Sequence, residues 1–176
     1  RSVIYRLLAM MVIAAAMSFA SEAFLTSNNL LNVLRQASLL FLLASGLTLV
    51  ILTAGLDLSV GANVALSACL AATVIKATGS VALGVSAGLG AGLLVGLANG
   101  LLVTLLRIPP FIATYGMLWI LHGVTYWFMK GETIHGFPAA FRAVGSGYWL
   151  GVPIPVYVML LFLVAGILFA QRTTWG

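Results

Sequence analysis

Polar residues and glycines interrupt the apolar sequence at Thr53-Ala54-Gly55-Leu56-Asp57-Leu58-Ser59-Val60-Gly61-Ala62-Asn63. This stretch places one carboxylate, two glycines, a serine and an asparagine between two apolar segments of membrane length. A charged side chain near the middle of a bilayer costs about 3 kcal/mol on insertion scales. Gly55 is suited to end the preceding helix, and Asp57 or Ser59 to accept from the free N–H groups that begin the next one. We therefore predict a broken helix near residues 53–63, with a short polar segment around which the other helices pack.

The composition points to a membrane protein. Of the 176 residues, 62% are hydrophobic and 6% are charged. A soluble domain of this size has too little interior to bury so much apolar surface. The net charge of +5 comes from scattered lysines and arginines without a basic cluster, which argues against a nucleic-acid partner. The prediction is an all-α, polytopic membrane helix bundle in contact with membrane lipid.

Apolar runs bounded by polar residues predict about six transmembrane helices. The spans are expected at residues 1–25, 39–54, 58–77, 81–106, 111–129 and 152–170. The first resembles a signal peptide but is interpreted as a retained helix, because further spans follow it. Residues 22–35 are expected to form a polar connection, and residues 130–151 an extramembrane stretch with a short amphipathic element. The basic residues divide evenly between the two sides, so charge alone leaves the topology open.

Within the fourth predicted span, glycine recurs at every fourth position. The ridge consists of Gly84, Gly88, Gly92, Gly96 and Gly100. Four residues turn an α-helix by about 400°, so such a ridge winds slowly round the helix. Ridges of small residues allow two helix backbones to approach closely. We expect interior helix packing here, with a dimer contact as the less favoured alternative.

The chain lacks the residue patterns of the common catalytic sites. Neither of its lysines, Lys76 and Lys130, stands in a phosphate-binding loop of the form Gly-x-x-x-x-Gly-Lys-Ser/Thr. The acids and histidines are Glu22, Asp57, Glu132, His122 and His135. They suggest no catalytic triad, and the pair Glu132 and His135 has too few ligands for a metal site. We expect no enzyme activity, no cofactor and no metal in this chain.

Several stretches taken together resemble the successive signatures of ribose-type ABC transporter permeases. They are Gly55-Leu56-Asp57-Leu58-Ser59-Val60-Gly61, Asn99-Gly100-Leu101-Leu102-Val103 and Arg107-Ile108-Pro109-Pro110-Phe111-Ile112-Ala113-Thr114. Residues 145–155 are similar to the family's entry into its next span. Residues 172–176 resemble the start of its cytoplasmic contact with the ATPase, with Trp175 where Phe is usual. The similarity runs from about Gly55 to the end of the chain, in the family's order and spacing.

The resemblance implies a multi-pass permease subunit of an ABC importer in the bacterial inner (plasma) membrane. Such a subunit translocates a monosaccharide (ribose-like, or a related small polyol or autoinducer-2) by alternating access. The implied partners are a second permease subunit in a homo- or heterodimer, a cytoplasmic ATP-binding subunit that hydrolyses ATP, and a periplasmic sugar-binding protein. Because family permeases are much longer, residues 1–176 are expected to form a single, incomplete permease domain that lacks its C-terminal part. The end at Arg172 is expected in the cytoplasm, and residues 130–151 are expected to face the binding protein.

A hydroxylated sugar needs a path with a few polar groups and aromatic faces. The candidates for this substrate pathway are Asp57, Ser59, Asn63, Asn99, Thr114, Tyr115 and Trp119. For Asp57, capping of the broken helix is favoured over direct contact with the sugar. The ATPase contact is expected to begin at Arg172, Thr173, Thr174 and Trp175.

Two other classes of protein remain open from the residues alone. An ion-coupled secondary transporter or channel also places an acid at a helix break in the middle of the membrane. A membrane scaffold without transport activity would account for the glycine ridge by itself. The energy source of uptake, and co-purification of an ATPase and a sugar-binding protein, would distinguish these classes.

Overall fold

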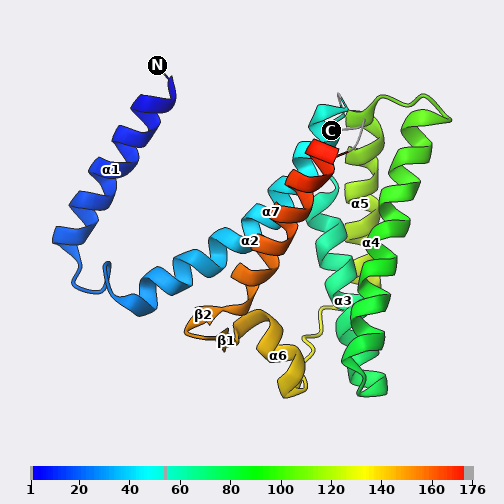
Figure 1. Ribbon diagram of the computed structural model, residues 1–176. Coiled ribbons are helices and arrows are strands. Elements are labelled where there is room, and N and C mark those ends of the chain that lie inside the picture. Colours follow the sequence, from blue (N-terminus) through cyan, green and yellow to red (C-terminus); the bar gives the residue numbers. More distant parts are fainter. Residues whose placement is uncertain (1, 54, 173–176) are drawn as a thin grey trace. The chain divides into compact units, whose positions relative to one another are not determined.

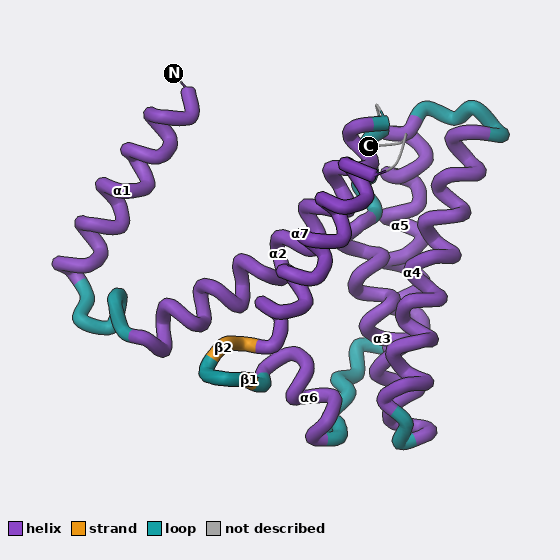
Figure 2. Tube along the Cα trace, in the orientation of Figure 1, coloured by secondary structure: helices purple, strands orange, loops and turns teal. Residues whose placement is uncertain are grey.

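A computed structural model describes residues 2–53 and 55–172, which contain seven helices and a two-stranded hairpin (Figure 1). The helices are α1 (Ser2–Ala20), α2 (Ser27–Leu52), α3 (Val60–Thr78), α4 (Val81–Thr104), α5 (Pro110–Met129), α6 (Ala139–Ser146) and α7 (Ile154–Arg172). The strands are β1 (Tyr148–Trp149) and β2 (Val152–Pro153). Helix accounts for 79% of the chain, and Figure 2 shows that loops are short by comparison. The predicted all-α class is confirmed.

Four of the described helices are long and apolar enough to cross a membrane. The stretches are Val3–Ala20, Ser27–Leu52, Val60–Thr78 and Val81–Thr104. The membrane helix bundle is therefore confirmed, whereas the expected count of about six spans is too high for the described residues. Helices α5 and α7 do form where the last two spans were expected. However, α5 mixes polar residues into its apolar sequence, and the apolar stretch of α7 covers only Ile154–Phe169.

Helix α2 begins earlier than expected, because the polar residues before it cap the helix instead of forming a long connection. The Thr26 hydroxyl oxygen accepts from the main-chain N–H of Asn29 at 3.4 Å. The Asn29 side-chain amide donates to the Phe24 carbonyl at 2.8 Å. Polar side chains that satisfy free N–H groups mark the start of a helix. The predicted polar connection at residues 22–35 was therefore wrong for the part after Thr26.

The chain forms two compact units, and the first comprises residues 1–41 and 148–176. In its described part, β1 and β2 pair antiparallel, with Tyr148 opposite Pro153. The Arg35 guanidinium on α2 donates to the Tyr148 hydroxyl and lies 5.1 Å from the centre of its ring. The Tyr157 hydroxyl on α7 donates to the Trp149 carbonyl at 2.9 Å. These contacts attach the hairpin to the start of α2 and to α7.

The second unit, residues 42–147, is built around α3, α4 and α5 (Figure 1). Its buried apolar cluster consists of Ala62, Leu66 and Leu121, with Leu70, Val95, Met117 and Leu118 packed against it. Gly79 ends α3 with a positive φ of 69°, and its N–H donates to the Ile75 carbonyl. Ser80 then caps α4 by accepting from the Leu83 N–H. This short connection makes α3 and α4 an antiparallel hairpin of helices.

The first three glycines of the ridge lie against α3. A Cβ atom at Gly84 would collide with the side chain of Ile75, and one at Gly88 would lie 2.9 Å from the Ser67 carbonyl oxygen. A Cβ at Gly92 would lie 3.3 Å from the Ser67 hydroxyl oxygen. Close approach of the two backbones thus requires small residues at these positions.

The last two glycines of the ridge, Gly96 and Gly100, face open space, since nothing lies within 4 Å of a Cβ built there. The ridge therefore divides between a packing surface and an open surface, as its slow winding allows. The opposite side of α4 is exposed at Leu89, Leu93 and Leu97. Within the described part of the second unit, the side of α4 that carries Gly84, Gly88 and Gly92 packs against α3, while its leucine side is exposed.

The stretch after α5 contains the short helix α6, at the place where an amphipathic element was expected. The rings of Phe137 and Phe141 lie 5.3 Å apart. Phe137 before the helix and Phe141 within it are partly buried, while Arg142, the next residue of the helix, is exposed. Helix α6 therefore has one apolar and one polar side.

Candidate functional site

At the end of α2, two hydrogen bonds to a single carbonyl oxygen stabilise the turn that begins the break between α2 and α3. The Val50 carbonyl oxygen accepts from the N–H of Thr53 at 3.2 Å and from the N–H of Gly55 at 3.0 Å. A Cβ at Gly55 would lie 3.1 Å from both the Cγ1 atom and the carbonyl oxygen of Val50. These contacts leave little room for a side chain at Gly55, so the turn that ends α2 favours a glycine there.

At the start of α3, the Asp57 carboxylate accepts hydrogen bonds from Ser59, the residue that precedes the helix. Its Oδ1 atom accepts from the Ser59 main-chain N–H at 2.8 Å and from the Ser59 hydroxyl at 2.6 Å. The Ser59 side chain makes no capping bond to the first turn of α3. Neither of the two expected caps forms, because Asp57 accepts from Ser59, the residue before the helix, instead of from the first turn of α3. Ser59 is completely buried.

Two residues on other helices complete this cluster. The Asn99 side-chain amide on α4 donates to the Ser59 hydroxyl oxygen at 2.8 Å. The Thr114 hydroxyl on α5 lies within reach of the Leu56 carbonyl at 3.1 Å and of the Pro110 carbonyl at 2.8 Å. Side chains from α4 and α5 therefore bind residues 55–59, the non-helical stretch before α3, which is called the interrupted segment below. Buried polar groups that are paired in this way fix the conformation of a segment that lacks regular helical hydrogen bonds.

Asp57, Asn99 and Thr114 of this cluster line a cavity of about 370 Å³ within the second unit. The lining residues are Val50, Thr53, Gly55, Leu56, Asp57, Gly96, Asn99, Gly100, Val103, Thr104, Pro110 and Thr114. Gly96 and Gly100 contribute space because they carry no side chain. The cavity combines an apolar wall with a few polar groups, which is the usual composition of small-molecule sites.

The structure therefore brings together four of the seven residues predicted for the substrate pathway, namely Asp57, Ser59, Asn99 and Thr114. Asn63 lies elsewhere, between α3 and α4, where its amide donates to the Gly92 carbonyl at 3.3 Å.

Tyr115 and Trp119 lie on an exposed side of α5 and do not line the cavity. They belong to a row of rings with Phe111 and His122, in which neighbouring ring centres are 6.0–6.3 Å apart. Thr114, in contrast, is 3% exposed and lines the cavity. The structure thus separates the aromatic candidates from the polar ones.

Sequence reasoning missed the direct bond between Ser59 and Asn99 and the bond from Thr114 to the Leu56 carbonyl. The residues concerned are 40 and 58 positions apart in the chain. A weak signal existed for Thr114, because Pro110 at the first turn of α5 fixes where that helix begins. The other lining residues, such as Val50 and Val103, carried no signal that distinguishes them from ordinary apolar positions.

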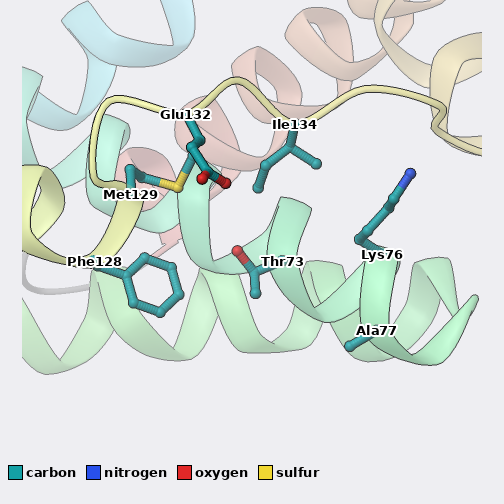
Figure 3. A pocket seen from close by; sticks show the side chains of 7 residues that line it. All are labelled: Thr73, Lys76, Ala77, Phe128, Met129, Glu132 and Ile134. Carbon is teal, nitrogen blue, oxygen red and sulfur yellow. The ribbon is translucent and has the colours of Figure 1, made fainter.

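A second cavity, of about 380 Å³, lies between α3 and the segment that follows α5 (Figure 3). Its lining includes Thr73, Lys76, Phe128, Met129, Glu132 and Ile134. The Lys76 ammonium donates to the His135 carbonyl at 2.8 Å and so attaches this segment to α3. None of the residues predicted for the substrate pathway lines this cavity.

The remaining predicted contacts lie at the end of the chain. Arg172 is the last residue of α7 and is exposed. Thr173, Thr174 and Trp175 lie outside the described residues. Among residues 2–53 and 55–172, no group of three or more histidines, cysteines and acids gathers at one point.

A family model and several curated relatives, all permease components of transport systems, match this chain. A family model described as "Branched-chain amino acid transport system / permease component" matches residues 29–176. The ribose import permease protein RbsC of Bacillus subtilis (strain 168) is 40% identical over 171 residues, which cover 96% of this chain and 53% of that protein. RbsC of Escherichia coli (strain K12) is 40% identical over 174 residues, or 97% of this chain and 54% of that protein.

More distant relatives carry other substrate names. The autoinducer 2 import system permease protein LsrC of Escherichia coli O157:H7 is 32% identical over 170 residues, or 97% of this chain and 50% of that protein. The galactose/methyl galactoside import permease protein MglC of Escherichia coli (strain K12) is 33% identical over 154 residues, or 79% of this chain and 46% of that protein. No solved structure matches the chain. The chain spans about half the length of the curated relatives it matches.

The family match covers most of the chain, and the identity to the ribose import permeases extends over nearly all of it. The resemblance to ribose-type permeases found in the sequence is thereby confirmed. The relatives are inner-membrane permeases, and the four membrane-length helices agree with that location. The chain therefore belongs to the branched-chain amino acid transport system / permease component family of inner-membrane proteins.

Proposed function

We propose that this chain is part of the permease subunit of an ABC importer that moves a monosaccharide across the inner membrane. The solute is ribose-like, or a related small polyol or autoinducer-2, in line with the names of the relatives. The subunit works by alternating access with a second permease subunit in a homo- or heterodimer. A separate ATP-binding subunit hydrolyses ATP, and a periplasmic binding protein delivers the solute.

The observation that supports this proposal most strongly is the polar cavity at the break between α2 and α3. Asp57, Ser59, Asn99 and Thr114 gather there, in a chain of which 62% of the residues are hydrophobic and 6% are charged. Polar residues within membrane helices are expensive to bury, and by default they mark a pathway for solute or ions. A sugar passing such a site exchanges hydrogen bonds with water for bonds with a small number of protein groups. A sparse set of partners keeps binding weak enough for release.

Uptake measurements with a controlled energy source test this proposal. Cells that produce the complete protein with its partner subunits are given radiolabelled D-ribose or D-galactose. We expect uptake to stop when ATP is depleted, and to continue in glycolysing cells when ionophores collapse the proton and sodium gradients. An ion-coupled secondary transporter or channel, which the acid at the helix break also fits, would behave in the opposite way. Uptake that survives ATP depletion but stops with the ionophores would therefore contradict the proposal.

A further inference from the structure

The hydrogen bonds around Ser59 have only one possible direction. A carboxylate such as that of Asp57 accepts hydrogen bonds and cannot donate them. The Ser59 hydroxyl therefore donates its single proton to Asp57 Oδ1, at 2.6 Å. Towards Asn99 the Ser59 oxygen can then only accept, so Asn99 must present its NH₂ group, at 2.8 Å. The carboxylate of Asp57 thus determines, through Ser59, which end of the Asn99 amide points away from the cluster.

The end that points away is the carbonyl oxygen, and it lacks a partner. Asn99 is 6% exposed, and its Oδ1 atom makes no hydrogen bond within the described residues. Nearly all buried polar atoms in native proteins are paired, so an unpaired acceptor of this kind requires an explanation. Asn99 also lines the cavity of about 370 Å³. An occupant of that cavity can supply the missing hydrogen-bond donor once the oxygen is uncovered.

The other hydroxyl groups that line the cavity use their protons within the protein. Thr53 donates to the Val50 carbonyl and Thr104 to the Gly100 carbonyl, and Thr114 shares its one proton between the Leu56 and Pro110 carbonyls. Their oxygen atoms can therefore only accept hydrogen bonds from an occupant of the cavity. A ligand that brings its own O–H groups complements such a lining.

The size of the cavity favours an organic solute over a bare cation. Small-molecule sites usually measure about 300–1,000 Å³, and this cavity measures about 370 Å³. A hard cation instead needs about six oxygen ligands that converge on one point. Asp57 is the only acid that lines the cavity within the described residues.

We propose that Asn99 Oδ1 accepts a hydrogen bond from one hydroxyl of the transported polyol and thereby selects solutes that carry a hydroxyl at that position. Asp57 and Ser59 are positioning residues that hold the Asn99 amide in this orientation. The oxygen is covered in the present conformation, so the solute reaches it when α4 and the interrupted segment move apart during transport. This inference rests on the proposed function and adds the group that the site recognises.

Deoxyfluoro sugars provide the test, because fluorine nearly preserves the size of a hydroxyl but cannot donate a hydrogen bond. The sugar used is D-ribose or D-galactose, whichever is taken up faster. Its uptake is compared with the uptake of each of its monodeoxyfluoro analogues, at concentrations that saturate the binding protein. Leaving a buried acceptor unpaired costs enough to slow transport of one analogue by about 5- to 100-fold. In Asn99→Leu, that analogue and the parent sugar should be taken up at nearly equal rates.

The matched control is Asn63→Leu, which removes the same side chain from the contact between α3 and α4 but outside the cavity. It should keep the full discrimination between sugar and analogue, even if it lowers the amount of folded protein. Asn99→Ala serves as a second variant should Asn99→Leu fail to fold. Ser59→Ala frees the Asn99 amide to rotate, so it should reduce discrimination without removing Asn99.

Three results would overturn the inference. They are the absence of any discriminated analogue in the unaltered protein, full discrimination in both Asn99 variants, and loss of discrimination in Asn63→Leu. Failure of the proposed function looks different, because uptake of the parent sugar would then not depend on ATP in any variant. All variants share one binding protein, so a change in the ratio between variants reports on the permease itself.

Discussion

Replacing Gly88 by leucine should remove most of the folded protein from the membrane. Gly88 lies where α4 crosses α3, and a Cβ there would lie 2.9 Å from the Ser67 carbonyl oxygen and 3.0 Å from the Ala71 Cβ. Neither of these atoms belongs to a flexible side-chain end that can move aside. Overpacking usually costs about 1–3 kcal/mol, and we expect the upper end of that range because two helix backbones would have to separate. The yield of monodisperse protein in detergent, measured by size-exclusion chromatography, should fall sharply.

Gly90 provides the control for this prediction. It lies on the same helix two residues further on, and nothing lies within 4 Å of a Cβ built there. Gly90→Leu should therefore give nearly the yield of the unaltered protein. Similar yields for Gly88→Leu and the unaltered protein would show that α3 and α4 do not pack through the glycine ridge.

The second large effect is expected from Asp57→Ala. This change leaves the completely buried Ser59 without the acceptor for its N–H and its hydroxyl. Hydrogen bonds to a charged group contribute about 1.5–3 kcal/mol each, so the interrupted segment should lose its fixed conformation. Uptake of labelled sugar per amount of folded protein should fall by about 100-fold, which corresponds to about 3 kcal/mol.

Asp57→Asn distinguishes the structural role of Asp57 from a role of its charge. The amide oxygen of asparagine can accept both bonds from Ser59, so this variant should retain uptake within a few-fold of the unaltered protein. If Asp57→Asn were as inactive as Asp57→Ala, the negative charge itself would be needed. That result would favour binding of a cation at this site over the positioning role assigned here.

Much of the fold could be predicted because the main signals are local. Composition and long apolar runs indicate membrane helices, and Gly55 with Asp57 indicates the break between α2 and α3. The spacing of the glycines on α4 indicates a side without bulky side chains, against which the backbone of another helix can pack closely. The predicted start of α2 was wrong. Thr26 and Asn29 make hydrogen bonds that cap the helix, and polarity in the sequence alone does not distinguish a helix cap from a loop.

The composition of the site could be predicted only in part, because it depends on which helices meet. Asp57 and Ser59 were found from one local stretch. Their bond to Asn99, and the bond from Thr114 to the Leu56 carbonyl, join positions that only packing brings together. The expected need for aromatic faces also selected Tyr115 and Trp119, which are exposed, whereas Thr114 on the same helix is buried. Which side of a helix faces the cavity is decided by the neighbouring helices.

Cysteine labelling can show whether water and solute reach the cavity at the helix break. Gly100 lines the cavity and has free space for a side chain, so Gly100→Cys can be introduced in a Cys69→Ala background, which removes the single cysteine of residues 1–176. Leu97→Cys on the same helix is the control, because Leu97 is exposed but does not line the cavity. We expect a charged thiol reagent to label Gly100→Cys in membrane vesicles, saturating transported sugar to slow that labelling several-fold, and Leu97→Cys to remain unlabelled in lipid. Failure of Gly100→Cys to react from either side of the membrane, or labelling that sugar leaves unchanged, would contradict the claim that this break forms the path of the solute.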